Sequence, residues 1–296
     1  MPVKSHIALA ICCFFWATSF IATKIALETM GPMTLAGMRH VAACLCFFCW
    51  FGLTLKKEQN WPKFSGSLLA NLFILSLLAV SAHHVAQITG LKYTSAANAS
   101  VYAATGPIMI FLIAAVFLKE RISSRKIFGI VSAASGVVLV MGIKTLLAFT
   151  ISDRLYGDLL VIFSIFTWAC FTVFSKKTIT NLLPMQLTAA ITFLGTATLL
   201  PLTFIELNLP DKSLYHVSLK SWLAAGFLGV TSSFVSNLLY LRALKTAESQ
   251  KVAIYLYTIP PMTAFMAAFL LHEPITLHLI TGTLLVFVGV FLLQKD

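Results

Sequence analysis

Ten apolar runs of about twenty residues recur along the 296-residue chain, and they constrain its fold more than any other feature. A helix needs ~20 mostly apolar residues to cross the hydrocarbon core of a bilayer, so each run is long enough for one crossing. The remaining residues suffice only for short connections, which excludes a separate soluble catalytic or receptor domain. We expect membrane spans near residues 6–28, 34–54, 67–90, 96–118, 123–143, 156–175, 185–206, 221–241, 250–271 and 275–293.

The composition agrees with a polytopic, all-α membrane protein. Hydrophobic residues make up 59% of the chain and charged residues only 10%, whereas soluble domains carry about 25% charged residues. A water-soluble globule is therefore excluded. The net charge of +11 does not indicate nucleic-acid binding, because the basic residues are spread over short loops and form no continuous basic face. The lipid bilayer is the expected partner, and the sequence leaves the oligomeric state open.

The distribution of basic residues predicts the orientation. Loops facing the cytoplasm accumulate Lys and Arg. With the N-terminus inside, fourteen basic residues are cytoplasmic, and the outer side holds Lys92, Lys144, Arg154, Lys212 and Lys220. We expect both termini in the cytoplasm and the chain in the inner (cytoplasmic) membrane of a cell. Lys24 and Arg39 fall within spans, and we expect both to reach the outer interface with their long side chains.

The two halves of the sequence match at an offset of 152 or 153 residues. Matched pairs in five consecutive spans include Trp16 with Trp168, Pro32 with Pro184, Tyr102 with Tyr255, Pro107 with Pro260, Glu120 with Glu273, and Gly129 and Gly136 with Gly282 and Gly289. So many matches in register predict a duplication, with one five-helix repeat in residues 1–145 and a second in 153–296.

Five is an odd number, so the second repeat enters the membrane upside down relative to the first. Inverted repeats of this kind are the architecture of secondary transporters, because exchanging the conformations of the two halves converts an outward-open form into an inward-open one. The alternative, a duplication retained only for packing, stays open.

The chain resembles EamA-type members of the drug/metabolite transporter superfamily over essentially its whole length. The matching segments are Trp16-Ala-Thr-Ser-Phe, Pro32 followed by Arg39, Gly90-Leu-Lys-Tyr-Thr-Ser-Ala, Lys119-Glu120, Ala243-Leu-Lys-Thr-Ala, Pro260 and His272-Glu273. The resemblance implies a ten-helix metabolite carrier with both termini inside. It identifies the architecture and leaves the substrate open.

A polar stripe in the third span has a counterpart in the eighth. Val80, His83, His84 and Gln87 are spaced i, i+3, i+4 and i+7, which places them on one helical face. Adding 153 gives Ser233, Ser236, Asn237 and Tyr240. Unsatisfied polar groups in hydrocarbon cost several kcal/mol, so both stripes must face protein or a water-filled cavity. Cavity lining and hydrogen bonding between helices are the two alternatives.

Aromatic residues add further candidates. Trp16 and Ser19 in the first span and Trp168 and Phe171 in the sixth lie near mid-depth, where a tryptophan usually needs a partner for its N–H. Tyr102 and Tyr255 lie at mirrored depths in the fourth and ninth spans, which suits a pair of gates, although interfacial anchoring explains tyrosines equally well.

The missing residue types narrow the mechanism. No carboxylate lies deep in a span, whereas sodium sites and proton relays generally use buried carboxylates. If protons are coupled, His83 or His84 is the deep titratable candidate. Cys46 and Cys49 lack the second pair or histidine cluster of a zinc site. We expect no metal, no cofactor and no enzymatic activity.

These observations predict a secondary transporter that moves a small neutral or zwitterionic metabolite, such as an amino acid, by alternating access. A broad-specificity efflux pump for apolar compounds is the alternative. Substrate identity, direction and coupling ion stay open. The expected substrate-binding residues are Trp16, Ser19, His83, His84, Gln87, Tyr102, Trp168, Phe171, Ser236, Asn237, Tyr240 and Tyr255.

Overall fold

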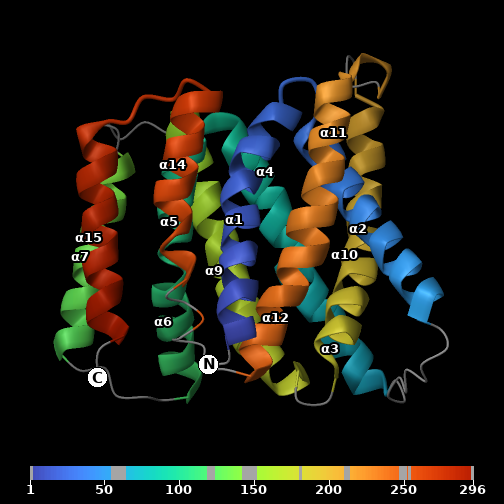
Figure 1. Ribbon diagram of the computed structural model, residues 1–296, viewed down its shortest axis with the longest axis horizontal. Coiled ribbons are helices and arrows are strands. Elements are labelled where there is room, and N and C mark those ends of the chain that lie inside the picture. The colour runs from blue at the N-terminus through green and yellow to red at the C-terminus, as the bar shows by residue number, and fades with distance from the viewer. Residues whose placement is uncertain are drawn as a thin grey trace.

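The computed structural model describes residues 3–54, 65–118, 124–141, 152–179, 182–209, 214–246, 252 and 255–294. All regular secondary structure within these ranges is helical, and the helices stand side by side as one sheaf (Figure 1). The first and last described helices have their outer chain ends, Val3 and Gln294, at the same edge of the sheaf.

The first half of the chain supplies five rods. They are α1 (Val3–Ala26); α2 (Pro32–Thr54); a rod of α3 (Gly66–Ser76), the π-helical η1 (Leu77–Ala82) and α4 (His83–Tyr93); a rod of α5 (Ala96–Ala103) and α6 (Gly106–Leu118); and α7 (Ser124–Met141).

The second half repeats this order. Its elements are α9 (Asp153–Ile179); α10 (Pro184–Leu207); a rod of α11 (Leu219–Phe227), the π-helical η3 (Leu228–Ser236) and α12 (Asn237–Thr246); α14 (Ile259–Leu270); and α15 (Leu277–Gln294), with the short 3-10 helix η2 (Leu214–His216) after α10. The boundary that we expect between the repeats, 145–153, falls mainly outside the described residues.

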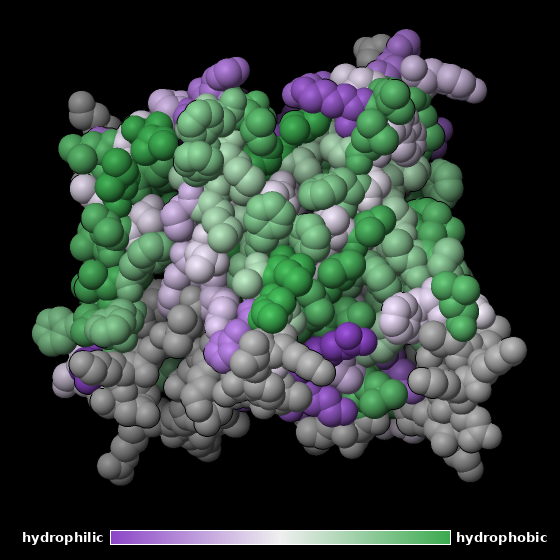
Figure 2. Space-filling model, viewed as in Figure 1, coloured by the Kyte–Doolittle hydropathy of each residue, from purple (hydrophilic) through white to green (hydrophobic). Residues whose placement is uncertain are grey.

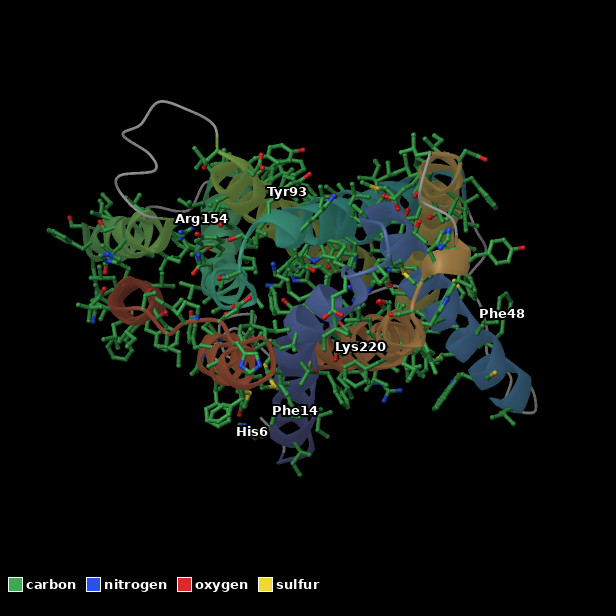
Figure 3. The ribbon with its side chains drawn as sticks, turned by 90° about the horizontal axis from the view of Figure 1, so that it is seen from above. His6, Phe14, Phe48, Tyr93, Arg154 and Lys220 are labelled. Carbon is green, nitrogen blue, oxygen red and sulfur yellow. The ribbon has the colours of Figure 1, made fainter. Side chains whose placement is uncertain are left out.

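Seven of the described helical rods are long and apolar enough to cross a membrane, and three shorter apolar helices, at 127–140, 259–270 and 277–289, accompany them. Hydrophobic side chains form a broad band across the face shown in Figure 2, and hydrophilic ones gather toward its upper and lower edges. Large apolar side chains such as Phe48 lie at the rim of the sheaf (Figure 3). The chain is thus a helical multi-pass membrane protein, and ten crossings stay a prediction.

Prolines and hydroxyl caps set several helix ends. Pro32 and Pro184 open α2 and α10, because proline has no N–H to leave unsatisfied in a first turn. Ser65, Ser95 and Ser218 precede α3, α5 and α11, and each side chain accepts a backbone N–H three residues on. Pro62 and Pro210, which fall between the expected spans, lie outside the described residues.

The prolines expected within continuous spans instead follow helix breaks. The fourth rod is interrupted at Ala104–Thr105, immediately before Gly106 and Pro107. The ninth is interrupted at Tyr257–Thr258, immediately before Ile259 and Pro260. Proline removes one helical hydrogen bond and its ring clashes with the carbonyl four residues earlier, so the helix restarts at the proline. The two breaks match at the repeat offset of 153.

The third and eighth rods contain π-helical turns at matching positions, η1 and η3. π-Helical turns are uncommon and recur at functional sites, because they rotate the side chains that follow relative to an uninterrupted α-helix. Both interruptions come immediately before the polar residues His83, His84 and Asn237.

Glycines bring the fifth helix of each repeat into close contact. A Cβ on Gly136 of α7 would lie 2.6 Å from the carbonyl oxygen of Gly282 in α15, and a Cβ on Gly289 would lie 2.5 Å from that of Gly129. The two contacts are related by the repeat offset, which is what an antiparallel pair of equivalent helices requires. Backbones can approach this closely in membranes only where side chains are small.

Gly136→Ala is expected to lower the free energy of unfolding by about 1–3 kcal/mol, because the added methyl forces the two backbones apart. The measurement is the melting temperature of purified protein in detergent. Gly52→Ala, whose Cβ meets nothing within 4 Å, is the matched control and leaves that temperature unchanged or slightly higher. Equal melting temperatures for both variants would contradict the close contact.

Candidate functional site

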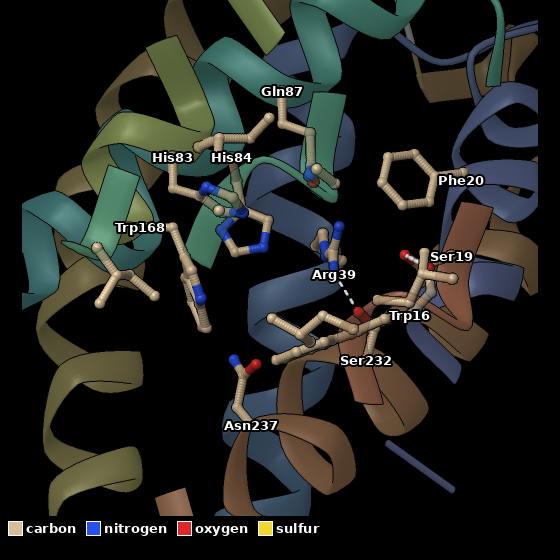
Figure 4. A pocket seen from close by; sticks show the side chains of 16 residues that line it. Trp16, Ser19, Phe20, Arg39, His83, His84, Gln87, Trp168, Ser232 and Asn237 are labelled. Atoms are coloured by element: carbon tan, nitrogen blue, oxygen red, sulfur yellow. Dashed lines mark hydrogen bonds between the residues drawn. The ribbon is translucent and has the colours of Figure 1, made fainter. Parts of the chain in front are cut away.

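A cavity lies where the two repeats meet, about midway along the rods (Figure 4). It holds about 710 Å³ of empty space, counting the part that opens to the outside. Its walls come from α1, α2, α4, α5, α6, α9, η3, α12, α14 and the Leu256 turn: Trp16, Ser19, Phe20, Arg39, His83, His84, Gln87, Ala103, Gly106, Ile110, Ile165, Trp168, Ser232, Asn237, Leu256 and Ile259.

Lining residues occur in pairs related by the repeat. Trp16 pairs with Trp168 at an offset of 152, and His84 pairs with Asn237 at 153. The residues that flank the two helix breaks also pair, Ala103 with Leu256 and Gly106 with Ile259. Equivalent positions of both halves thus line one cavity, and inverted-repeat transporters bind substrate at such an interface between repeats, among discontinuous helices.

Two tryptophans and a tyrosine form one wall. The rings of Trp16 and Trp168 meet edge to face, with centroids 5.7 Å apart. Tyr240 packs behind both, 5.1 Å from Trp16 and 5.8 Å from Trp168, and is itself 2% exposed. Edge-to-face aromatic contacts hold the rings in fixed positions, so the cavity has a rigid aromatic surface.

A histidine group adjoins this wall, with the His83 ring centroid 5.2 Å from that of Trp168 (Figure 4). The rings of His83 and His84 pack edge to face at 4.7 Å, and His40 of α2 packs on His84 at 4.4 Å. His83 Nδ1 donates to the Ser164 carbonyl at 2.8 Å, and His84 Nδ1 donates to the Val80 carbonyl at 3.1 Å. Because a carbonyl only accepts, these bonds place the proton on Nδ1, and Nε2 of a neutral ring is then an acceptor.

Arg39 is the cationic side chain among the lining residues, and it lies against the second repeat. It is 2% exposed, its Nε donates to Ser233 Oγ at 3.0 Å and its Nη2 donates to Ser232 Oγ at 3.1 Å. The expectation that Arg39 reaches the outer interface is therefore wrong. It lies two turns inside α2, and the η3 hydroxyls hold its guanidinium at the cavity (Figure 4).

Lys24 does lie in the last turn of α1, as expected.

Seven of the predicted binding residues line the cavity: Trp16, Ser19, His83, His84, Gln87, Trp168 and Asn237. The prediction that both polar stripes avoid lipid is confirmed, since most of their residues are buried within the protein. Whether the seven bind substrate stays a prediction.

Five predicted residues do not line the cavity. Tyr240 and Phe171 support the aromatic wall from behind, with Phe171 5.1 Å from Trp168. The Ser236 hydroxyl donates to the Thr231 carbonyl. Tyr102 is fully buried at the junction of α5 and α9, and the Tyr255 hydroxyl hydrogen-bonds to His6. Four of these side chains pack against or bond to a neighbouring helix and Ser236 bonds within its own rod, which helical spacing alone does not specify.

Sequence reasoning missed Arg39, Phe20 and Ser232 as lining residues. A charged residue two turns inside an apolar run, without an acidic neighbour on its own helix, was the available signal for Arg39. Ser232 precedes the predicted stripe by one residue, and the π-helical turn brings both Ser232 and Ser233 against Arg39. Phe20 carried no distinguishing signal.

The described carboxylates lie near helix ends, as predicted, but two of them are buried. Asp158, in the second turn of α9, accepts a hydrogen bond from the Thr94 hydroxyl and lies 3.9 Å from Arg154. Glu206, in the last turn of α10, accepts from the Thr34 backbone N–H at 2.7 Å and the Thr34 hydroxyl at 2.8 Å. Neither residue lines the cavity.

Glu273 joins the two repeats. Its carboxylate accepts from the N–H groups of Ala96 at 2.9 Å and Ala97 at 3.1 Å, which caps the first turn of α5. His272 makes this possible, because its φ of 54° ends α14 and turns the chain back. The Glu273 carboxylate therefore caps a helix of the other repeat. Glu120, its counterpart, lies outside the described residues.

The sequence and the fold are similar to known proteins throughout. The model of the EamA-like transporter family matches residues 3–142 and 155–294. An uncharacterized transporter of Archaeoglobus fulgidus is 31% identical over 99% of this chain and 98% of its own. The uncharacterized transporter YoaV of Bacillus subtilis is 25% identical over 98% and 96%. A solved crystal structure aligns with a TM-score of 0.67 over 99% of this chain and 96% of its own at 16% identity, which shows a shared fold.

Cysteine substitution tests which side chains reach the cavity. Gln87→Cys and Asn237→Cys are expected to react with a small, water-soluble methanethiosulfonate reagent beyond the labelling of the parent chain, because both positions line the cavity. Phe171→Cys is the matched control and is expected to stay unlabelled, since its side chain is 1% exposed and packs behind Trp168. Labelling of Phe171→Cys as fast as the other two would contradict the assigned walls.

Proposed function

The chain belongs to the EamA-like transporter family, and from this premise we propose that it is a secondary transporter that binds a small metabolite in the cavity between its two repeats. The observation that carries the proposal is the set of paired lining residues, because a site built from equivalent positions of both halves can be exposed first to one side and then to the other.

Alternating access fits the positions of the helix interruptions. The fourth and ninth rods break beside the cavity, and the third and eighth contain π-helical turns beside it. Short interruptions let the two parts of a rod change direction without unfolding either one. Because every interruption in one repeat has a counterpart in the other, the same rearrangement is available in mirrored form.

The chemistry of the walls favours a small zwitterionic or neutral metabolite such as an amino acid. The aromatic wall suits an apolar substrate group, whereas Gln87, Asn237 and the imidazoles offer several hydrogen-bond donors and acceptors. A site with directed polar groups discriminates more strongly than an apolar one, because a wrong substrate leaves these groups unpaired.

A broad-specificity efflux pump is the second candidate. The observation that favours it is the apolar part of the lining, which includes Ile110, Ile165, Leu256 and Ile259. An apolar surface of this kind can bind many different lipophilic molecules. Transport of a panel of unrelated lipophilic compounds in proteoliposomes separates the two candidates, since a selective carrier moves few of them.

The proposed orientation places both termini in the cytoplasm. Both chain ends lie at the same edge of the sheaf. In the predicted topology, that edge carries more basic residues than the opposite edge. In a bacterial cell the corresponding membrane is the inner one.

His84→Ala and Asn237→Ala are expected to reduce kcat/KM for substrate transport in proteoliposomes by about tenfold or more, because each removes a cavity hydrogen-bonding group. Folding, measured by melting temperature and size-exclusion profile, stays intact. Ile74→Ala and Leu223→Ala are matched controls on the same two rods, since both side chains are more than half exposed. Wild-type transport by both cavity variants would remove these residues from the site.

Reporter fusions test the topology. A reporter active only in the cytoplasm is expected to be active at both ends of the chain, and a reporter active only outside is expected to be inactive at both. A reporter in the 210–213 connection, on the predicted outer side, gives the reverse result and is the control. Chain ends on opposite faces would contradict the inverted five-helix repeats.

A further inference from the structure

The guanidinium of Arg39 is a buried positive charge at the edge of the cavity. Its side chain is 2% exposed and is held by two serine hydroxyls of the opposite repeat. Hydroxyl oxygens solvate a cation but do not neutralise it. Removing an ion from water costs several kcal/mol unless an opposite charge lies close to it, and arginine stays protonated in proteins.

The described carboxylates do not supply that opposite charge. Glu28 pairs with Lys220 at 3.1 Å, and Asp158 lies beside Thr94 and Arg154. Glu206 and Glu273 cap the N-termini of α2 and α5, and Asp153 is exposed in the first turn of α9. Among the described residues, therefore, no acidic side chain forms an ion pair with Arg39.

The surroundings of Arg39 strengthen its preference for an anion. Its neighbours in the cavity are neutral side chains, namely Trp16, His84, Gln87 and Ser232. The half-helices α6 and α14 begin at the cavity wall, with Gly106 and Ile259 in the lining. The N-terminal end of a helix carries a partial positive charge, so both half-helices add to the potential of the guanidinium.

We propose that Arg39 binds the anionic group of the transported molecule, which makes the substrate an organic acid or zwitterion with a carboxylate or comparable anion. The proposal rests on the proposed transport function and narrows its substrate class. In this arrangement, the anionic group of the substrate lies at Arg39, and the apolar part of the substrate lies along the Trp16 and Trp168 rings. Organic cations without an acidic group are excluded, because nothing in the described lining offsets their charge and Arg39 repels it.

A purely structural role makes a different prediction. If Arg39 only ties α2 to η3, its loss destabilises the protein equally whether the added compound is an acid or its amide. If Arg39 binds substrate, wild-type protein distinguishes an acid from the amide of the same shape. The comparison of compounds therefore tests for an anion site, and Arg39→Gln assigns that site to Arg39.

The test compares acetate, hexanoate, phenylacetate and phenylalanine with their amides as stabilisers of purified protein in detergent at constant ionic strength. A ligand that binds the folded state raises its melting temperature. We expect at least one acid to raise it more than its amide does. Arg39→Gln should weaken the apparent affinity for that acid by about tenfold or more, and Arg39→Lys should retain part of it. Lys220→Gln, which removes an exposed cation outside the cavity, is the matched control and leaves affinity unchanged.

An equal effect of every acid and its amide on the wild type overturns the proposal, as does an acid preference that survives in Arg39→Gln. Chloride and gluconate salts distinguish the source of the anion. If chloride alone stabilises the wild type through Arg39 and the acids add nothing, the site holds an inorganic ion and the assignment to substrate is wrong. Uptake into proteoliposomes is measured separately. Its absence contradicts the proposed function, whereas selective uptake of cations or amides contradicts only the role of Arg39.

Discussion

Hydrocarbon offers no hydrogen bonds, and this constraint shapes the whole molecule. Every polar group within the apolar band must find a partner inside the protein. Threonine and serine hydroxyls do so by donating to carbonyls one turn back, as Thr192 and Thr196 do in α10. Side chains too large for that arrangement meet at the centre, where the two repeats enclose them. The cavity therefore contains large polar side chains that cannot face lipid, such as Arg39, His84 and Gln87.

The two halves share a design but contribute unequal chemistry. The tryptophans, the helix breaks and the π-helical turns are duplicated, whereas the charge is not. Arg39 belongs to α2, and the residues at the equivalent offsets in α10 are Ile191 and Thr192. Likewise, His83 and His84 of the third rod correspond, at the offset of 153, to Ser236 and Asn237 of the eighth. Duplication thus accounts for the shared framework, and divergence of a few side chains makes the cavity chemically asymmetric.

Sequence alone was sufficient for the framework. The apolar helices, the internal repeat and the polar stripes follow from periodicities of 3.6 and about 152 residues, which are properties of a one-dimensional string, whereas the ten crossings and the repeat boundaries stay predictions. The direction of a side chain within the interior is not such a property. Tyr102 and His84 are both predicted binding residues, yet Tyr102 packs against α9 and His84 reaches the cavity. Arg39 was placed wrongly because its distance from the helix end suggested the interface, whereas the serines that hold it lie almost 200 residues away in the chain.

The hydrogen bonds from α5 to Glu273 tie the end of the second repeat to the start of a helix in the first. Because the Glu273 carboxylate of one repeat binds the first turn of α5 in the other, α5 can tilt there only if the link between α14 and α15 moves with it or the hydrogen bonds break. These hydrogen bonds therefore connect any movement of α5 in the first repeat to the α14–α15 link of the second. Under the proposed alternating access, this link would couple the two halves, and a form open to both sides of the membrane would require these hydrogen bonds to break first.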